Sequence, residues 1–129
     1  MPLLSAAGLE FVTERHLATV TTIRADGTPH ATPAGFTWDG EAGLARVICS
    51  GTSRKAHNVG AGGRVAVCQF EGRRWLTLEG QGHVVTAADA VAEAVARYAT
   101  RYRQPRVNPE RVVIEVHVDR ILGTAAFVP

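Results

Sequence analysis

Lysine, cysteine and long apolar runs are scarce in this sequence, and each scarcity argues against a class of protein or partner. Lys55 is the single lysine among 14 basic residues, and the formal net charge is only +2, so electrostatics alone give no argument for a nucleic-acid partner. No stretch approaches the roughly 18 apolar residues of a membrane span, and the first residues lack the regions of a secretory signal. Cys49 and Cys68 lie in apolar, strand-like runs, where reduced core cysteine is expected. We therefore expect a cytoplasmic protein without a membrane or nucleic-acid partner.

Motifs for metal binding and nucleophilic catalysis are also missing. No Cys-x-x-Cys occurs, and close ligand spacing is absent among the five histidines, which are His16, His30, His57, His83 and His117. We therefore expect no metal site. The sequence contains neither a nucleophile elbow nor a Walker A loop nor a dinucleotide-binding glycine fingerprint.

What the sequence does contain is a succession of short β-prone runs. The 129 residues fit one domain, 1–129. Strands are predicted over 17–23, 28–38, 44–49, 64–70, 73–85 and 112–119. A short helix is predicted within 3–15, with Ser5 as N-cap, and a longer one after an N-cap at Thr86. Glu93 and Arg97 are spaced to pair on the longer helix.

The turns between these runs predict an antiparallel sheet. Asp26-Gly27 favours a two-residue type I′ hairpin, and Gly80 and Gly82 indicate a bend or a close backbone approach within their strand. Six short strands are best closed into a barrel, because closure removes exposed edges. The expected fold is mainly β: a six-stranded antiparallel split β-barrel with a short N-terminal helix and a longer helix before the last strand.

The segment from Ser50 to Asn58 carries most of the chemistry. Three hydroxyl groups, Arg54 and Lys55 fall within six residues, where a strand gives way to a helix. Free N–H groups at a helix start favour a phosphate, and Arg and Lys add charged hydrogen bonds. An ordinary capped surface helix with two solvated cations explains the same residues equally well.

Trp75 and the arginines allow two interpretations as well. Trp75 is either a core residue or an aromatic wall against a planar ring. Several arginines lie near it or near the end of the long helix and could line a groove for a polyanion: Arg73, Arg74, Arg97, Arg101, Arg103 and Arg106. Cations near a helix C-terminus are favourable without any ligand.

The order of the motifs resembles a known superfamily. Residues 17–30, with their Asp-Gly-Thr-Pro-His end, are followed by Gly-Phe-Thr-Trp-Asp at 35–39 and Ser-Arg-Lys-Ala-His-Asn at 53–58. Together they resemble the pyridoxamine-phosphate-oxidase-like split-barrel superfamily. Further segments at 14–18, 74–80, 101–103 and 111–116 resemble its deazaflavin-dependent branch, which uses coenzyme F420.

The resemblance implies a homodimer with two cofactor sites at its interface. In similar proteins the second and third strands contact the ring system, the following loop binds the phosphate, and an aromatic residue of the other subunit closes the pocket. Many relatives place an arginine two residues before the lysine, a place that either Ser53 or Arg54 would take here. The implied cofactor-binding residues are His30, Ala31, Thr32, Pro33, Ile48, Cys49, Ser50, Ser53, Arg54, Lys55, Asn58 and Trp75.

The function that this resemblance implies is hydride transfer. Reduced F420 would reduce a conjugated acceptor, with biliverdin the favoured one and His30 or Tyr102 as candidate proton donors. Two alternatives stay open: an FMN-dependent oxidase or reductase of the same fold, and a non-catalytic protein that binds F420 or a tetrapyrrole.

Overall fold

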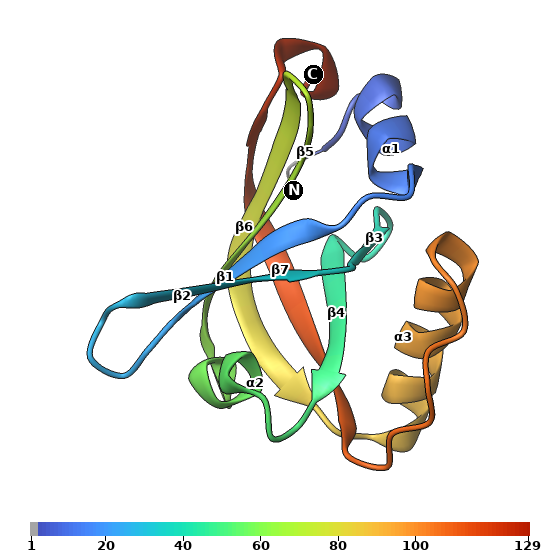
Figure 1. Ribbon diagram of the computed structural model, residues 1–129. Coiled ribbons are helices and arrows are strands. Elements are labelled where there is room, and N and C mark those ends of the chain that lie inside the picture. Colours follow the sequence, from blue (N-terminus) through green and yellow to red (C-terminus); the bar gives the residue numbers. More distant parts are fainter. Residues whose placement is uncertain (1–2) are drawn as a thin grey trace.

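In the computed structural model, residues 3–129 are described and form one strongly curled antiparallel sheet that carries three α-helices (Figure 1). The helices are α1 (Ala6–Thr13), α2 (Arg54–Val59) and α3 (Ala88–Arg101), and a 3-10 turn, η1 (Ala125–Phe127), ends the chain. The strands are β1 (Ala18–Ile23), β2 (Pro29–Ala34), β3 (Thr37–Asp39), β4 (Leu44–Ser50), β5 (Gly63–Glu71), β6 (Arg74–Val85) and β7 (Arg111–Gly123).

The sheet has seven strands and is open, so the prediction of a closed six-stranded barrel is wrong. Its order is β2-β1-β5-β6-β7-β4-β3, and no strand ladder in residues 3–129 joins β2 to the other edge. The two edge strands nevertheless follow one another in the chain, separated only by Gly35 and Phe36. The sheet must therefore curl until its two edges approach, and β2 passes in front of β6 and β7 in Figure 1.

The seventh strand arises because the predicted strand 28–38 breaks after Ala34. A Cβ atom on Gly35 would lie 2.8 Å from the ring of Tyr102 and 2.9 Å from that of Tyr98. The N–H of Phe36 donates to the hydroxyl oxygen of Tyr102 at 3.3 Å rather than to a neighbouring strand. Two tyrosines at the end of α3 thus occupy the place where the ladder would continue, and β3 pairs instead with β4.

Two local predictions are also wrong. The loop after β1 has three residues, because Gly27 N–H donates to Arg24 O and Arg24 N–H donates to Thr28 O. In this loop only Gly27 has a positive φ. The turn is therefore a type I turn followed by a glycine bulge, and not the predicted type I′ turn. The N-cap of α3 is Ala87, without a side-chain hydrogen bond, rather than Thr86. The N-cap of α1 is Ser5, as predicted, and its hydroxyl accepts from Gly8 N–H at 3.1 Å.

Glycines shape the long strand β6 as predicted. The register between β6 and β7 shifts between Glu79 and Gly80, and a Cβ on Gly80 would collide with the carbonyl oxygen of His117. A Cβ on Gly82 would lie 2.7 Å from a methyl of Val65. Both positions therefore need glycine for the close approach of neighbouring strands.

The core lies inside the curl. Its fully buried members come from most strands and from α1, and include Phe11, Val20, Phe36, Val47, Val67, Leu76, Leu78, Ile114 and Val116. No helix in the described part of the chain is long and apolar enough to cross a membrane.

Candidate functional site

The segment Ser50–Asn58 contains the end of β4, a tight turn and the short helix α2. Ser53 is the N-cap of α2, and its hydroxyl accepts from Ala56 N–H at 3.3 Å. The hydroxyls of Ser50 and Thr52 lie 2.9 Å apart and share a hydrogen bond. Gly60 ends the helix with φ +48°, a conformation that favours glycine. The hydroxyl groups in this segment therefore already form hydrogen bonds within the segment itself.

Arg54 and Lys55 are the two cations of this segment that no acid within residues 3–129 neutralises. Within residues 3–129, neither side chain forms an ion pair or a side-chain hydrogen bond. Arg54 is exposed and Lys55 is half-buried. Burial raises the pKa of the Cys49 thiol, while the Ser53 hydroxyl and the charge of Lys55 act in the opposite direction. Lys55 and Ser53 thus lie close to Cys49.

Asn58 joins α2 to the sheet. Its Nδ2 donates to Oγ1 of Thr22 at 3.0 Å, and Thr22 is fully buried on β1. Asn58 also lines a groove of about 600 Å³ between α2 and the loop after β1, together with Arg54, His57 and Arg24. The structure therefore brings Arg54 and Asn58 to one groove. Neither His57 nor Arg24 was expected there, because only the fold places the hairpin beside α2.

On β2, alternate residues face opposite sides of the sheet. His30 pairs with Thr22, and Thr32 pairs with Val20, two fully buried residues of β1. Nδ1 of His30 and Oγ1 of Thr32 are buried and have no hydrogen-bond partner in the described part of the chain. Buried polar atoms are nearly always paired in folded proteins, so two orphaned atoms on one strand indicate a place for a ligand or water. Ala31 and Pro33 are exposed on the other face.

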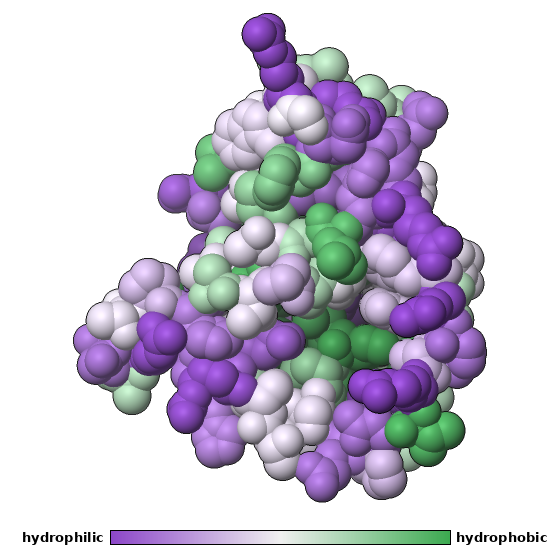
Figure 2. All heavy atoms as spheres, in the orientation of Figure 1, coloured by the Kyte–Doolittle hydropathy of each residue, from purple (hydrophilic) through white to green (hydrophobic). Residues whose placement is uncertain are grey.

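The end of β4 supplies Ile48, Cys49 and Ser50, all half-buried. Figures 1 and 2, drawn in the same orientation, show a hollow with hydrophobic side chains on its floor over this end of β4, between the hairpin side and α3. Hydrophilic side chains surround it (Figure 2). An apolar floor with polar surroundings is typical of a site for a planar organic molecule.

Trp75 lies far from this hollow in the same chain. It is 42% exposed and pairs with Phe70 at one end of β6, whereas Gly82, near the other end, pairs with Gly63 beside α2. Seven residues of strand span roughly 23 Å. A single chain therefore does not bring Trp75 to the Ser50–Asn58 segment.

Phe70 is 61% exposed and Leu122 is 42% exposed, and together with Trp75 they define an exposed apolar group at that end of the sheet.

Three of the six arginines suggested for a polyanion groove have protein partners instead. Arg74 pairs with Glu14 and Glu71, and Arg97 pairs with Glu93 and Asp39. Arg101 donates to the carbonyl oxygens of Glu14 and Phe36, and burial lowers its pKa. The predicted Glu93–Arg97 pair is confirmed at 3.0 Å.

Tyr102, a candidate proton donor, is held by the protein. Its hydroxyl donates to the carbonyl oxygen of His16 at 2.7 Å, and burial raises its pKa. The hydroxyl also accepts from Phe36 N–H. This geometry assigns Tyr102 to holding the chain between β2 and β3.

The curled, open antiparallel sheet with a cation-bearing turn after β4 defines a class of small, mainly β protein. The chain belongs to the pyridoxamine 5′-phosphate oxidase family, whose model matches residues 4–125. This confirms the family predicted from the motifs.

Among individual proteins, the chain is 52% identical over 122 residues to the F420H(2)-dependent biliverdin reductase of Mycobacterium tuberculosis, covering 95% of this chain and 89% of that protein. A solved structure of an F420 reductase superposes with a TM-score of 0.69 at 24% identity, covering 88% and 94% of the two chains. HupZ of Group A Streptococcus gives a TM-score of 0.73 at 17% identity, covering 96% and 97%. These two structures support the fold alone.

Proposed function

We propose that this protein is a reductase that uses reduced coenzyme F420 to transfer a hydride to biliverdin. The 52% identity to the mycobacterial F420H(2)-dependent biliverdin reductase over nearly the whole chain carries the proposal. When bound, the deazaflavin supplies the hydride chemistry, and the protein supplies binding, orientation and electrostatics. The residues of this chain fit that task.

The anion-binding part of the site is Arg54 and Lys55. Both cations lack an acidic partner within residues 3–129, so each has its charge available for a phosphodiester. The Ser53 hydroxyl caps α2. Arg54 is therefore favoured over Ser53 as the replacement for the arginine that many relatives have two residues before the lysine. Ser50 and Asn58 complete this part of the site beside them.

The ring-binding part of the site consists of β2 and the end of β4. The orphaned atoms His30 Nδ1 and Thr32 Oγ1 supply hydrogen-bond partners for polar edges of a planar ring, while Ala31 and Pro33 present the opposite face of β2. The end of β4 adds Ile48 and Cys49, two half-buried side chains at successive positions of the strand. With Tyr102 committed to His16, His30 is the remaining residue proposed to hold or move a proton.

We propose a homodimer as the functional unit. Trp75 cannot reach the hollow of its own chain, but its exposed position beside Phe70 and Leu122 suits contact with a second copy, which would bring Trp75 against the cofactor held there. Two free cysteines suit the reducing cytoplasm, where we place the protein.

Binding titrations test the cofactor. Wild-type protein is titrated with F420 and with FMN, alongside Lys55→Ala and the exposed Arg15→Ala as a charge-matched control. Charged hydrogen bonds contribute about 1.5–3 kcal/mol, so K55A is expected to weaken F420 binding about 10–100-fold, with R15A like wild type. Tighter binding of FMN than of F420 would favour an FMN enzyme. K55A binding F420 as well as wild type would overturn the phosphate assignment.

Turnover tests the reaction. Reduced F420 with biliverdin is expected to give bilirubin, followed by the loss of biliverdin absorbance. Tight F420 binding without any spectral change would overturn the acceptor and favour a binding protein.

A further inference from the structure

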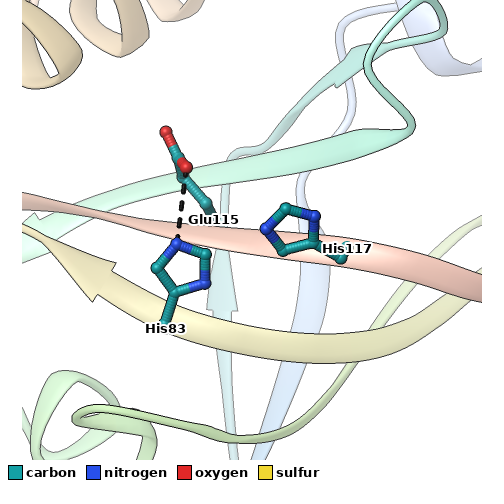
Figure 3. Close-up of side chains that lie close together, drawn as sticks. All are labelled: His83, Glu115 and His117. Carbon is teal, nitrogen blue, oxygen red and sulfur yellow. Dashed lines mark ion pairs between the residues drawn. The ribbon is translucent and has the colours of Figure 1, made fainter.

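Three side chains outside the proposed cofactor site converge on one face of the sheet. His83 projects from β6, and Glu115 and His117 project from β7 on the same side (Figure 3). His83 and Glu115 are directly paired across the two strands, and His117 lies two residues further along β7, so alternation returns it to the same face. One potential ligand atom from each residue lies within 4.8 Å of the other two.

The three side chains approach without hydrogen-bonding one another. His83 Nε2 lies 3.6 Å from Glu115 Oε1, beyond hydrogen-bond distance. The two imidazole rings stack with their centroids 5.1 Å apart and their planes 16° from parallel. Neither histidine therefore forms a hydrogen bond with Glu115 or with the other ring, although one potential ligand atom of each residue lies within 4.8 Å of the other two.

The charge of Glu115 is poorly compensated by the protein. Its side chain is only 17% exposed, and within residues 3–129 its one ion-pair partner is His83. Arg46 is opposite Glu115 on β4, but its guanidinium binds Asp39 at 3.0 Å. A half-enclosed carboxylate without a firm cationic partner is a favourable ligand for a metal ion.

We propose that His83, Glu115 and His117 form a binding site for a divalent transition-metal ion, with zinc as the representative ion. Imidazole and carboxylate are ligands that zinc takes in proteins. Ligand atoms around a tetrahedral zinc lie about 3.4 Å apart. Small side-chain rotations would bring the three ligand atoms, which now lie within 4.8 Å of one another, to that spacing. The exposed His117 gives the ion an entry path, and three protein ligands leave a fourth position for water.

The site is tested with metal-stripped, tag-free protein titrated with zinc chloride by calorimetry, and with cobalt chloride by visible absorbance. One ion per chain and cobalt ligand-field bands are expected for the wild type. Losing even an outer-shell partner weakens metal sites about 10–100-fold, so His117→Asn and Glu115→Gln are each expected to weaken zinc binding at least about 100-fold.

His57→Asn, which removes an exposed imidazole on α2, is the matched control and is expected to bind zinc like the wild type. Circular dichroism establishes that each variant is folded. Wild-type protein without stoichiometric zinc binding overturns the proposal, as does H117N that binds as tightly as the wild type, or H57N that loses as much affinity as H117N.

Discussion

Arg101 Nη2 donates to Oε1 of Gln69 at 2.6 Å, and this contact ties the end of α3 to the interior of β5. Gln69 is fully buried, and its Nε2 donates to the carbonyl oxygen of Phe11 at 2.8 Å. One amide thus pairs with a half-buried cation on one side and a buried carbonyl on the other. The long helix, the first helix and the sheet meet at this side chain.

Replacing Gln69 by leucine is expected to destabilise the fold strongly. Q69L keeps the volume but removes the hydrogen bond from Gln69 to the Phe11 carbonyl and the acceptor for one N–H of the Arg101 guanidinium, so the free energy of unfolding should fall by about 2–4 kcal/mol. Urea denaturation followed by circular dichroism measures it. Gln81→Leu, at an exposed glutamine of β6, should stay within about 0.5 kcal/mol of wild type; equal losses in both variants would contradict the role of Gln69.

Gly80 is expected to tolerate no side chain. In G80A the new methyl would meet the backbone carbonyl of His117, which cannot move without disturbing β7, so we expect a loss of about 3 kcal/mol or more. Gly62→Ala is the control, because its methyl would meet only the flexible end of Gln81, at 3.2 Å. A G80A protein that melts at the temperature of G62A would show that the strands can separate at the bulge.

Sequence patterns predicted the strands well and their assembly less well. Alternating apolar residues located β1 and β7, and glycines marked the bulge at Gly80, since those signals are local. The break at Gly35 was missed because its cause is the packing of Tyr98 and Tyr102, which lie more than sixty residues further along the chain. A closed barrel was expected from strand count, whereas closure depends on whether the two edges meet.

For the candidate site too, the sequence indicates local features, whereas contacts between distant segments are seen only in the structure. The sequence singles out Arg54 and Lys55 by their place after a strand, and the structure adds that neither has an ion-pair partner within residues 3–129. The capping role of Ser53 and the orphaned atoms of His30 and Thr32 depend on three-dimensional contacts that no spacing reveals. His83 and His117 were judged too far apart for a metal site, yet strand pairing stacks their rings. A signal was present in the Glu115-x-His117 alternation, which puts two ligand types on one face.

Asp39 is expected to give the fold part of its acid sensitivity. Burial alone would raise the pKa of Asp39, but hydrogen bonds from Arg46 and Ala42 N–H and the charge of Arg97 outweigh it and lower the pKa. The ionised form is therefore favoured in the folded state, so its stabilisation is present above the unfolded pKa of about 4 and is lost as pH falls through the lower folded pKa.

In Asp39→Asn, the free energy of unfolding should be lower at pH 7 and should fall less steeply than in wild type as the solution is acidified below about pH 5. Denaturation at a series of pH values measures this. Asp89→Asn removes an exposed carboxylate at the start of α3 and serves as the control. Parallel wild-type and D39N curves would contradict the assignment.

Trp75 and Lys55 are expected to serve one site from two different chains. Trp75→Ala and Lys55→Ala should each lose F420-dependent biliverdin reduction as separate proteins. After the two are unfolded together and refolded, a mixed dimer carries one intact site, built from Lys55 of the W75A chain and Trp75 of the K55A chain. Random pairing of two chains makes half of the dimers mixed, so activity should return to about a quarter of the wild-type value.

If both residues served a site within one chain, no pairing would restore it, and activity at the level of the separate variants would contradict the shared site. Each variant refolded alone is the control, and sedimentation at the assay concentration must show dimers.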